Sequence, residues 1–179
     1  PVWERDLGPF VSQHGPGSSP IVYEGRVVVS NVQDGESSFI ALDAKTGAPR
    51  WKLPRAGGQE GATSYSTPCV FQPKVGKAVL VFTTRYNGVT AVDPDTGKVV
   101  WEYEKAFNMR TVSSPFIGSG LIFGTCGSGG GGSCVVAIRP GDGAGKAHGK
   151  SKQCDRGARP ERGSVRTGGK AGGEADRHR

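Results

Sequence analysis

The sequence contains no long apolar run and no extended stretch with the apolar spacing of an amphipathic helix. Without a long apolar run, these residues contain no signal peptide and no transmembrane segment. The helical spacing is missing from every stretch of ten or more residues, which favours an all-β fold.

Residues that commonly carry chemistry are also few. The chain has three histidines and four cysteines, and no nucleophile, base and acid stand at a recognisable catalytic spacing. A zinc site usually needs four close cysteine or histidine ligands, and no histidine lies near Cys126 and Cys134 in the sequence. We therefore expect no catalytic residue and no metal ligand in this chain.

The last 39 residues, 141–179, lack leucine, isoleucine, phenylalanine, tyrosine and tryptophan. Ten basic residues against five acidic ones give this segment a charge of +5, out of +7 for the whole chain. Such a composition buries too little apolar surface to offset chain entropy, so it predicts a disordered basic tail rich in Gly, Arg and Lys. One interpretation is an arm that binds nucleic acid or an anionic surface. A frameshift near residues 143–150 explains the change of composition better, and we expect no nucleic-acid partner.

The most prominent feature of the rest of the sequence is a motif that occurs twice, here called the repeated phrase. FIALDAKTGAPRW ends at Trp51 and VTAVDPDTGKVVW ends at Trp101, and both reduce to A-x-D-x-x-T-G-x-x-x-W. The phrase is carried by Ala41, Asp43, Thr46, Gly47 and Trp51, and again by Ala91, Asp93, Thr96, Gly97 and Trp101. A Ser/Thr-Pro pair recurs with the same period, at Ser19-Pro20, Thr67-Pro68 and Ser114-Pro115. Self-similarity at this period is typical of a repeat architecture.

Each copy holds four short β-rich runs separated by turn signals such as Asn87-Gly88. Four strands in forty to fifty residues is the size of one β-propeller blade. The sequence therefore predicts about three four-stranded antiparallel blades, at residues 19–55, 67–105 and 114–140. Trp3 stands 48 residues before Trp51, which predicts that residues 1–8 are the end of an earlier, partial blade.

The repeated residues have structural explanations. Gly47 and Gly97 suit a tight turn with a positive φ, and the aspartates before them can accept hydrogen bonds from the turn amides. Ala41 and Ala91 are small enough for a bulky side chain to pack against the strand. Each tryptophan is large enough to cover the seam between neighbouring blades.

These residues resemble the PQQ-repeat (quinoprotein-like) β-propeller family, over about residues 1–140. The third copy departs from the pattern, because Arg139 stands where aspartate is expected and no T-G-x-x-x-W follows. Propellers close with about four to eight blades, so the chain is expected to be a fragment of a longer propeller or a truncated product. The resemblance also implies export, to the periplasm or beyond.

The resemblance leaves three functions open. The favoured hypothesis is a non-catalytic scaffold that binds other proteins and needs no cofactor. The second is a fragment of a pyrroloquinoline-quinone-dependent dehydrogenase, which would need the quinone and calcium. The family's enzymes carry adjacent cysteines over the quinone, and no Cys-Cys pair occurs here. The third is a sensor or carbohydrate-binding propeller.

A few further residues are candidates for a site. Cys126 and Cys134 flank a glycine-rich run between two expected strands, so a cross-strand disulfide and two packed thiols are both open. His14 lies in a loop, where a ligand role and a solvated role are alternatives. Gln33, Asp34 and Arg85 stand near turns and are candidates for a channel mouth, although nothing in the sequence places them together.

Overall fold

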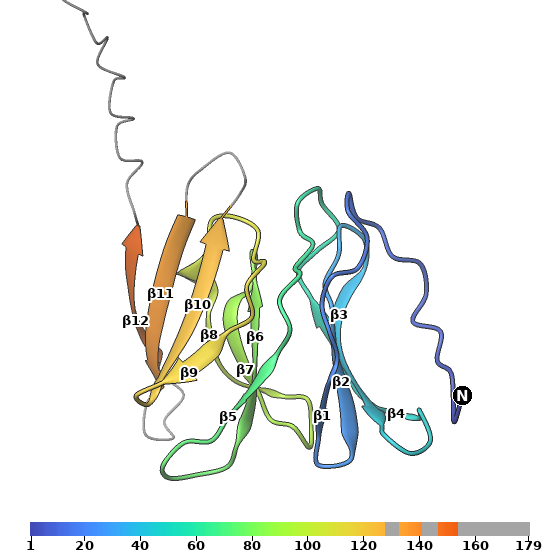
Figure 1. The fold of residues 1–179 in the computed structure, drawn as a ribbon. Coiled ribbons are helices and arrows are strands. Elements are labelled where there is room, and N and C mark those ends of the chain that lie inside the picture. The colour runs from blue at the N-terminus through green and yellow to red at the C-terminus, as the bar shows by residue number, and fades with distance from the viewer. Residues whose placement is uncertain (128–132, 141–146, 154–179) are drawn as a thin grey trace, which may run out of the picture.

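The computed structural model describes residues 1–127, 133–140 and 147–153, and within them it contains three four-stranded antiparallel sheets. Figure 1 labels their strands. The first sheet is β1 (Ile21–Tyr23), β2 (Arg26–Asn31), β3 (Ser37–Asp43) and β4 (Pro49–Arg55). The second is β5 (Cys69–Phe71), β6 (Val79–Thr84), β7 (Gly88–Val92) and β8 (Val99–Tyr103). The third is β9 (Phe116–Gly118), β10 (Leu121–Gly127), β11 (Ser133–Pro140) and β12 (Ala147–Gln153).

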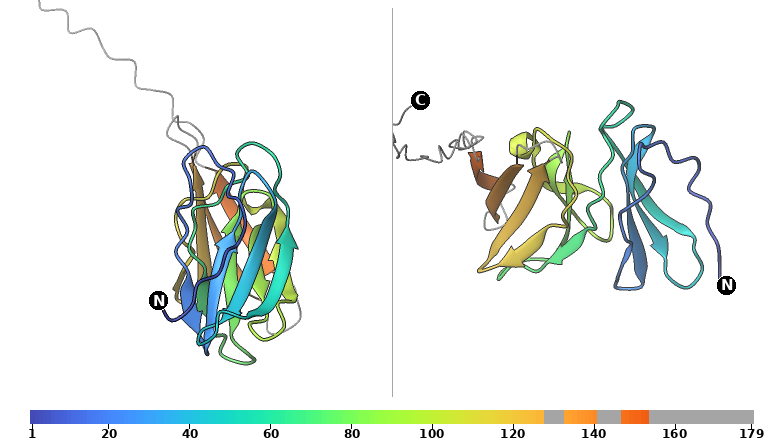
Figure 2. Two further views of the ribbon diagram at one scale, coloured as in Figure 1. Left: turned by 90° about the vertical axis from the view of Figure 1, so that its right-hand side faces the viewer. Right: turned by 45° about the horizontal axis from the view of Figure 1, so that its top comes forward.

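The three sheets stand side by side like the blades of an open fan (Figures 1 and 2). In each sheet the strands follow one another in chain order, and each pairs with the next. The one helical element described is a single 3₁₀ turn, η1 (Glu104–Ala106), between the second and third sheets. The predicted all-β fold of about three propeller blades is confirmed, and each sheet is called a blade below.

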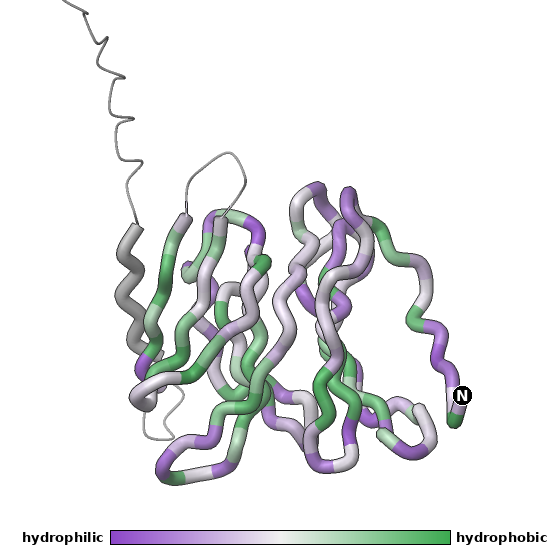
Figure 3. Tube along the Cα trace, viewed as in Figure 1, coloured by the Kyte–Doolittle hydropathy of each residue, from purple (hydrophilic) through white to green (hydrophobic). Residues whose placement is uncertain are grey.

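The strands form where β-branched and aromatic residues cluster, and hydrophilic residues mark the turns between them (Figure 3). Every residue of β6 and β7 is buried, because the second blade is covered on both faces. In β10 the burial alternates along the strand, as expected when one face packs on a core and the other does not.

Two apolar cores lie between successive blades. Between the first and second blades, the rings of Phe39 and Phe82 stack with centroids 3.8 Å apart. Between the second and third blades, Val81 and Trp101 pack against Ile122, Val136 and Ile138. Because each blade buries its face against its neighbour, no blade has a core of its own.

The segments that join the blades also carry specific contacts. They are residues 8–20, 56–68 and 104–115, here called the first, second and third connectors, and each leads into the first strand of a blade. No helix within the described residues is long and apolar enough to cross a membrane.

The structure corrects two expected boundaries. Strand β12 falls inside the segment 141–179 that was predicted to be disordered, and it pairs with β11 from Cys134 to Pro140. The composition argument failed there because ladder hydrogen bonds come from the backbone and need no apolar side chain. The third blade therefore ends at residue 153 and not at residue 140. Residues 141–146 and 154–179, and so the frameshift hypothesis, lie outside the described residues.

The second correction concerns residues 1–8, which form no strand. An outer strand is held by the ladder of the strand beside it, and none of the described strands lies beside this segment. Trp3 nevertheless makes the same kind of contact with the following turn as Trp51 does.

Candidate functional site

The two repeated turns have the same hydrogen bonds. Asp43 Oδ1 accepts from the amides of Lys45 and Thr46 and from the Thr46 hydroxyl, at 2.9–3.0 Å. Asp93 Oδ1 accepts the three equivalent bonds, from Asp95 and Thr96, at 2.8–3.0 Å. The aspartate and the threonine of the phrase thus fold the turn between the third and fourth strands of a blade.

The same bonds shift the acidity of both carboxyls. The Arg50 guanidinium, 2.5 Å from Asp43 Oδ2, and the bonds from Thr46 hold the pKa of Asp43 well below its usual range. Burial raises the pKa of Asp93, but the bonds from Thr96 outweigh it and the net shift is downward. Both aspartates are therefore structural anions of the turn.

Trp3 and Trp51 each dock on the turn of the blade that follows them. Trp51 Nε1 donates to the carbonyl of Pro94 at 2.9 Å, and a Cβ added at Gly97 would lie 2.7 Å from Trp51 Cδ2. Trp3 Nε1 donates to the carbonyl of Ala44 at 3.0 Å, and its ring lies equally close to Gly47. Both glycines have φ +71°, so the turn needs glycine for its conformation and for the close approach of the indole.

The small alanines stand opposite the tryptophans within each blade. Ala41 pairs with Trp51 across β3 and β4, and Ala91 pairs with Trp101 across β7 and β8. Trp101 is buried in the core between the second and third blades. The contacts of the repeated phrase therefore fold the turns and hold blades together, and Asp93 and Trp101 also line a cleft beside the β5–β6 turn.

The recurring Ser/Thr-Pro pairs form a ladder between the connectors. The amide of Ser19 donates to Thr67 Oγ1 at 3.0 Å, and the amide of Thr67 donates to Ser114 Oγ at 3.1 Å. A second, buried row lies beside it, in which Ser64 Oγ and Thr111 Oγ1 are 2.8 Å apart. Repeated hydroxyls thus satisfy connector amides that belong to no β-ladder.

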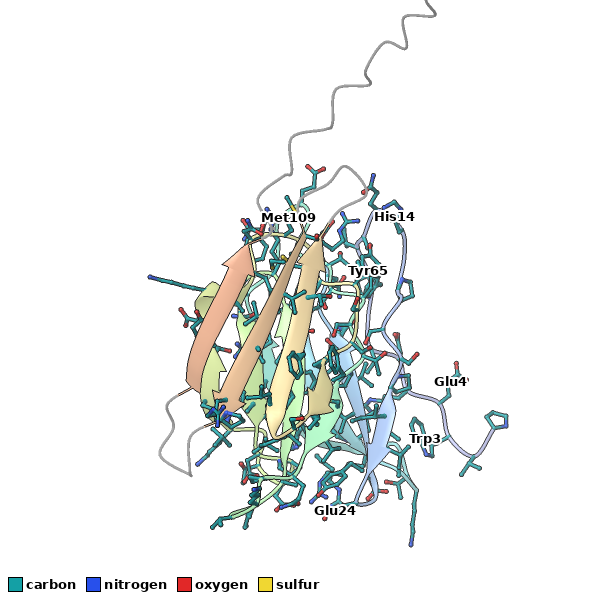
Figure 4. The ribbon with its side chains drawn as sticks, turned by 60° about the vertical axis from the view of Figure 1, so that its left-hand side comes forward. Trp3, Glu4, His14, Glu24, Tyr65 and Met109 are labelled. Carbon is teal, nitrogen blue, oxygen red and sulfur yellow. The ribbon has the colours of Figure 1, made fainter. Side chains whose placement is uncertain are left out.

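The three connectors bring four polar or aromatic side chains together at one end of the strands, the upper end in Figure 4, where His14 and Tyr65 are labelled. We call Ser12, His14, Tyr65 and Arg110 the connector cluster. Tyr65 is at its centre: its hydroxyl is 3.2 Å from Ser12 Oγ, and the Arg110 guanidinium lies over its ring at 5.6 Å. The His14 ring lies 6.4 Å from the Tyr65 ring, and Figure 4 shows His14, Tyr65 and Met109 at the same end of the molecule.

The backbone around Tyr65 fixes this arrangement. The Tyr65 amide donates to the carbonyl of Thr111 at 3.0 Å, which ties the second connector to the third. A Cβ at Gly17 would lie 2.6 Å from Tyr65 Cδ1, so glycine is needed there for the ring to pass the first connector. The ring is half-buried between segments that lead into three different blades.

The other loop candidates lie around the second connector. Asp34 Oδ1 accepts from the amide and hydroxyl of Thr63 at 2.9 and 2.8 Å, and Arg85 donates to the carbonyl of Gly61 at 3.4 Å. Burial raises the pKa of Asp34, but the bonds from Thr63 lower it further, so the net shift is downward. Gln33 is buried and its Oε1 accepts from the amide of Val11 at 2.6 Å, so it holds the first connector.

The two cysteines of the third blade are directly opposed across β10 and β11. Cys126 Sγ lies 3.5 Å from Asn108 Oδ1, and Cys134 Sγ lies 3.9 Å from the carbonyl of Ala106. No disulfide joins the two sulfurs in this structure, and the cross-strand disulfide and the two packed thiols both remain open. Among the described residues, no group of three or more histidine, cysteine, aspartate or glutamate side chains is arranged to hold a metal ion.

Sequence reasoning singled out His14, but it missed Tyr65 and Arg110. The sequence did contain a signal. The position three residues before the proline of each Ser/Thr-Pro pair differs between the three copies: it is Gly17, Tyr65 and Val112. A position that departs from an otherwise regular repeat, in a segment joining two blades, is where function rather than packing can differ between copies.

Comparison with known proteins gives the family. A family model described as outer membrane protein assembly factor BamB matches residues 1–162. BamB from Moraxella catarrhalis is 17% identical and aligns over 76% of this chain and 36% of its own, with a TM-score of 0.49. A europium-containing methanol dehydrogenase is 16% identical and aligns over 83% of this chain and 27% of its own, with a TM-score of 0.54.

The chain spans 36% and 27% of the length of these two structures, and the likeness to the methanol dehydrogenase, at 16% identity, shows the fold alone. A search of curated proteins found no match. The family match covers most of the chain, and the repeated phrase and the blades agree with it. The chain belongs to the BamB-like family of PQQ-repeat β-propellers.

Proposed function

We propose that this chain is part of a non-catalytic propeller that binds other proteins through the surface formed by the connector cluster. The observation that carries the proposal is the half-buried Tyr65 ring with Arg110 over it, at the meeting point of three connectors. Tyrosine and arginine are enriched among the residues that dominate binding energy at protein interfaces.

The surroundings of Tyr65 suit a protein partner. Val11 and Val112 are 53% and 57% exposed on the first and third connectors, and they add apolar area beside polar groups. Apolar contacts rimmed by hydroxyl, imidazole and guanidinium groups are typical of a non-obligate interface. Because all three connectors contribute, a partner would recognise the assembled blades and not one loop.

The family match supports the same function and suggests a location. The matched family is described as an outer membrane protein assembly factor, which is a role in binding other proteins. We infer an exported, periplasmic protein whose partners are other proteins together with the remaining blades of the propeller. In this proposal, neither quinone nor calcium is required.

Site-specific photo-crosslinking tests the proposal. A photoreactive amino acid replaces Val112, next to the connector cluster, and replaces Val75, which is 83% exposed on the turn between β5 and β6, in a matched control. With envelope proteins of the source cell, we expect a defined crosslinked product from position 112 and none from position 75. Tyr65→Ala in the first protein should reduce the product about tenfold, as expected for a residue that contributes heavily to binding.

A thermal melt of each variant checks that the blades stay folded. Equal crosslinking at both positions, or a yield that Tyr65→Ala leaves unchanged in a folded protein, would contradict the proposal.

The second candidate function is a fragment of a quinone-dependent dehydrogenase, supported by the fold likeness to methanol dehydrogenase at a TM-score of 0.54. Adding pyrroloquinoline quinone and calcium to the full-length propeller distinguishes the two. A new absorbance band together with alcohol-dependent dye reduction would favour the enzyme, and no dye reduction would favour the binding module.

A further inference from the structure

We propose that Cys126 and Cys134 form a cross-strand disulfide that clamps the β10–β11 hairpin of the third blade. The two residues are directly opposed Cα partners in the antiparallel ladder. Opposed Cα atoms in such a ladder lie about 4.5 or 5.5 Å apart, depending on the type of pair. Both separations fall within the roughly 4.4–6.8 Å that a disulfide spans, so the spacing of the strands permits the bond.

Both side chains also point to the same face of the hairpin. Burial alternates along β10 and β11, and Cys126 and Cys134 fall on the buried positions, with exposures of 4% and 8%. They belong to the core between the second and third blades, together with Ile122 and Ile138 from the same two strands. A shared face removes the second geometric obstacle to the bond.

The sulfurs remain within reach of a small reagent. Both cysteines line one cleft at the end of the hairpin, together with Val112 and Ser113 of the third connector. Oxidation removes the two thiol hydrogens, so the weak S–H···O contacts to Asn108 and Ala106 are exchanged for a covalent bond between the strands.

The bond forms by thiol–disulfide exchange with a low-molecular-weight disulfide such as oxidised glutathione. The thiolate of one cysteine attacks that disulfide, which forms a mixed disulfide and releases one thiol. The second thiolate then attacks the protein sulfur of the mixed disulfide, closes the Cys126–Cys134 bond and releases the second thiol. Two protons leave the cysteines, and the glutathione disulfide is reduced to two thiols.

Cys69 provides an internal control. It pairs with Val81 across β5 and β6, so no cysteine faces it, and burial raises the pKa of its thiol to about 11. It should therefore neither bridge nor exchange readily.

Peptide mapping of the intact chain tests the proposal without a mutation. Trypsin releases residues 111–146 as one peptide, because Arg139 precedes a proline, and this peptide contains Cys126 and Cys134 and no other cysteine. The reduced protein is treated with oxidised glutathione, alkylated and digested without reductant. We expect the peptide to lose the mass of two hydrogen atoms, to carry no alkyl group, and to gain two alkyl groups after reduction.

The variant Cys134→Ser tests whether Cys134 is the thiol that closes the bond. In Cys134→Ser the same peptide should carry one glutathione on Cys126, because the resolving thiol is missing. A wild-type peptide that carries alkyl groups or glutathione after the oxidation step would overturn the proposal. The proposal does not depend on the binding function above.

Discussion

At the level of single residues, the contact between blades depends on glycine at one place in each turn. Gly47 and Gly97 are buried, and a tryptophan from the preceding copy occupies the space where their Cβ would be. The spacing shared by the two copies therefore has a steric origin: the turn must leave its backbone uncovered where the indole packs, with a carbonyl beside it to accept the indole N–H.

Substitution of Gly97 by alanine tests this steric argument. A positive φ costs alanine about 1 kcal/mol, and overpacking against Trp51 adds about 1–3 kcal/mol. Gly97→Ala should therefore lower the free energy of unfolding by about 3 kcal/mol, as measured by urea denaturation. Gly120 is a matched control, since its φ is +72° and nothing lies within 4 Å of its Cβ position. Gly120→Ala should lose only about 1 kcal/mol, and equal losses would show that the indole contact is loose.

The lowered pKa of Asp43 leads to a second prediction about a single residue. Its native pKa lies below the ordinary value of 3.8, so the ionised form stabilises the fold above about pH 4. That stabilisation is lost as the pH falls through the native pKa. Asp43→Asn keeps an oxygen for the turn amides but does not titrate, so its Tm should fall less steeply than that of the wild type between about pH 4 and pH 2. Parallel Tm curves in thermal melts over this range would contradict the assignment.

At the level of strands, the outer edges of the first two blades are joined by a buried ion pair. Arg55 at the end of β4 pairs with Glu102 of β8, which also accepts from Thr90 Oγ1 at 2.6 Å. The guanidinium lies 5.2 Å from the Phe39 ring centroid, and its Nε has no hydrogen-bond partner. The side chains of Arg55 and Glu102 are 7% and 18% exposed, so removing one partner leaves the other charge poorly solvated.

Arg55→Met should therefore lower the free energy of unfolding by about 3 kcal/mol, and the double variant Arg55→Met/Glu102→Leu should recover much of the loss. Lys52 and Glu36 form an exposed pair on the first blade, 54% and 86% exposed, and serve as the comparison. Lys52→Met should change stability by less than about 1 kcal/mol. A double variant that is less stable than Arg55→Met would show that the pair is not an isolated electrostatic unit.

Strands were predictable where the signal is local. Two of the short β-rich runs expected in each copy are IVY, which is β1, and CVF, which is β5; both combine β-branched and aromatic residues and end at turn signals. Strand β12 was missed because its support comes from the open edge of β11 and not from its own residues. The connector cluster was missed for a related reason: Tyr65 and Arg110 lie on the connectors that precede and follow the second blade in the chain, and no local pattern encodes their contact.

At the level of the whole molecule, the blades are unequal because each relies on its neighbours. The second blade has a core on both sides, whereas the third has one described core, on the side of the second blade. Val135 and Phe116 of the third blade are 48% and 55% exposed, while the whole of β6 and β7 is buried. In repeat proteins stability is roughly a sum over units and interfaces, so a blade with two interfaces is harder to open than a blade with one.

Hydrogen exchange measures this difference directly. Amides of β6 and β7 should exchange only on global unfolding, and those of β10 and β11 should exchange at least about tenfold faster through local opening of the third blade. Oxidation with glutathione disulfide should slow β10 and β11 selectively, because a bond between Cys126 and Cys134 would hold the two strands together when the blade detaches. Mass spectrometry of peptic peptides resolves the two pairs of strands. Equal rates in the reduced protein would mean that the three blades open as one cooperative unit, and that the second blade gains no advantage from its two interfaces.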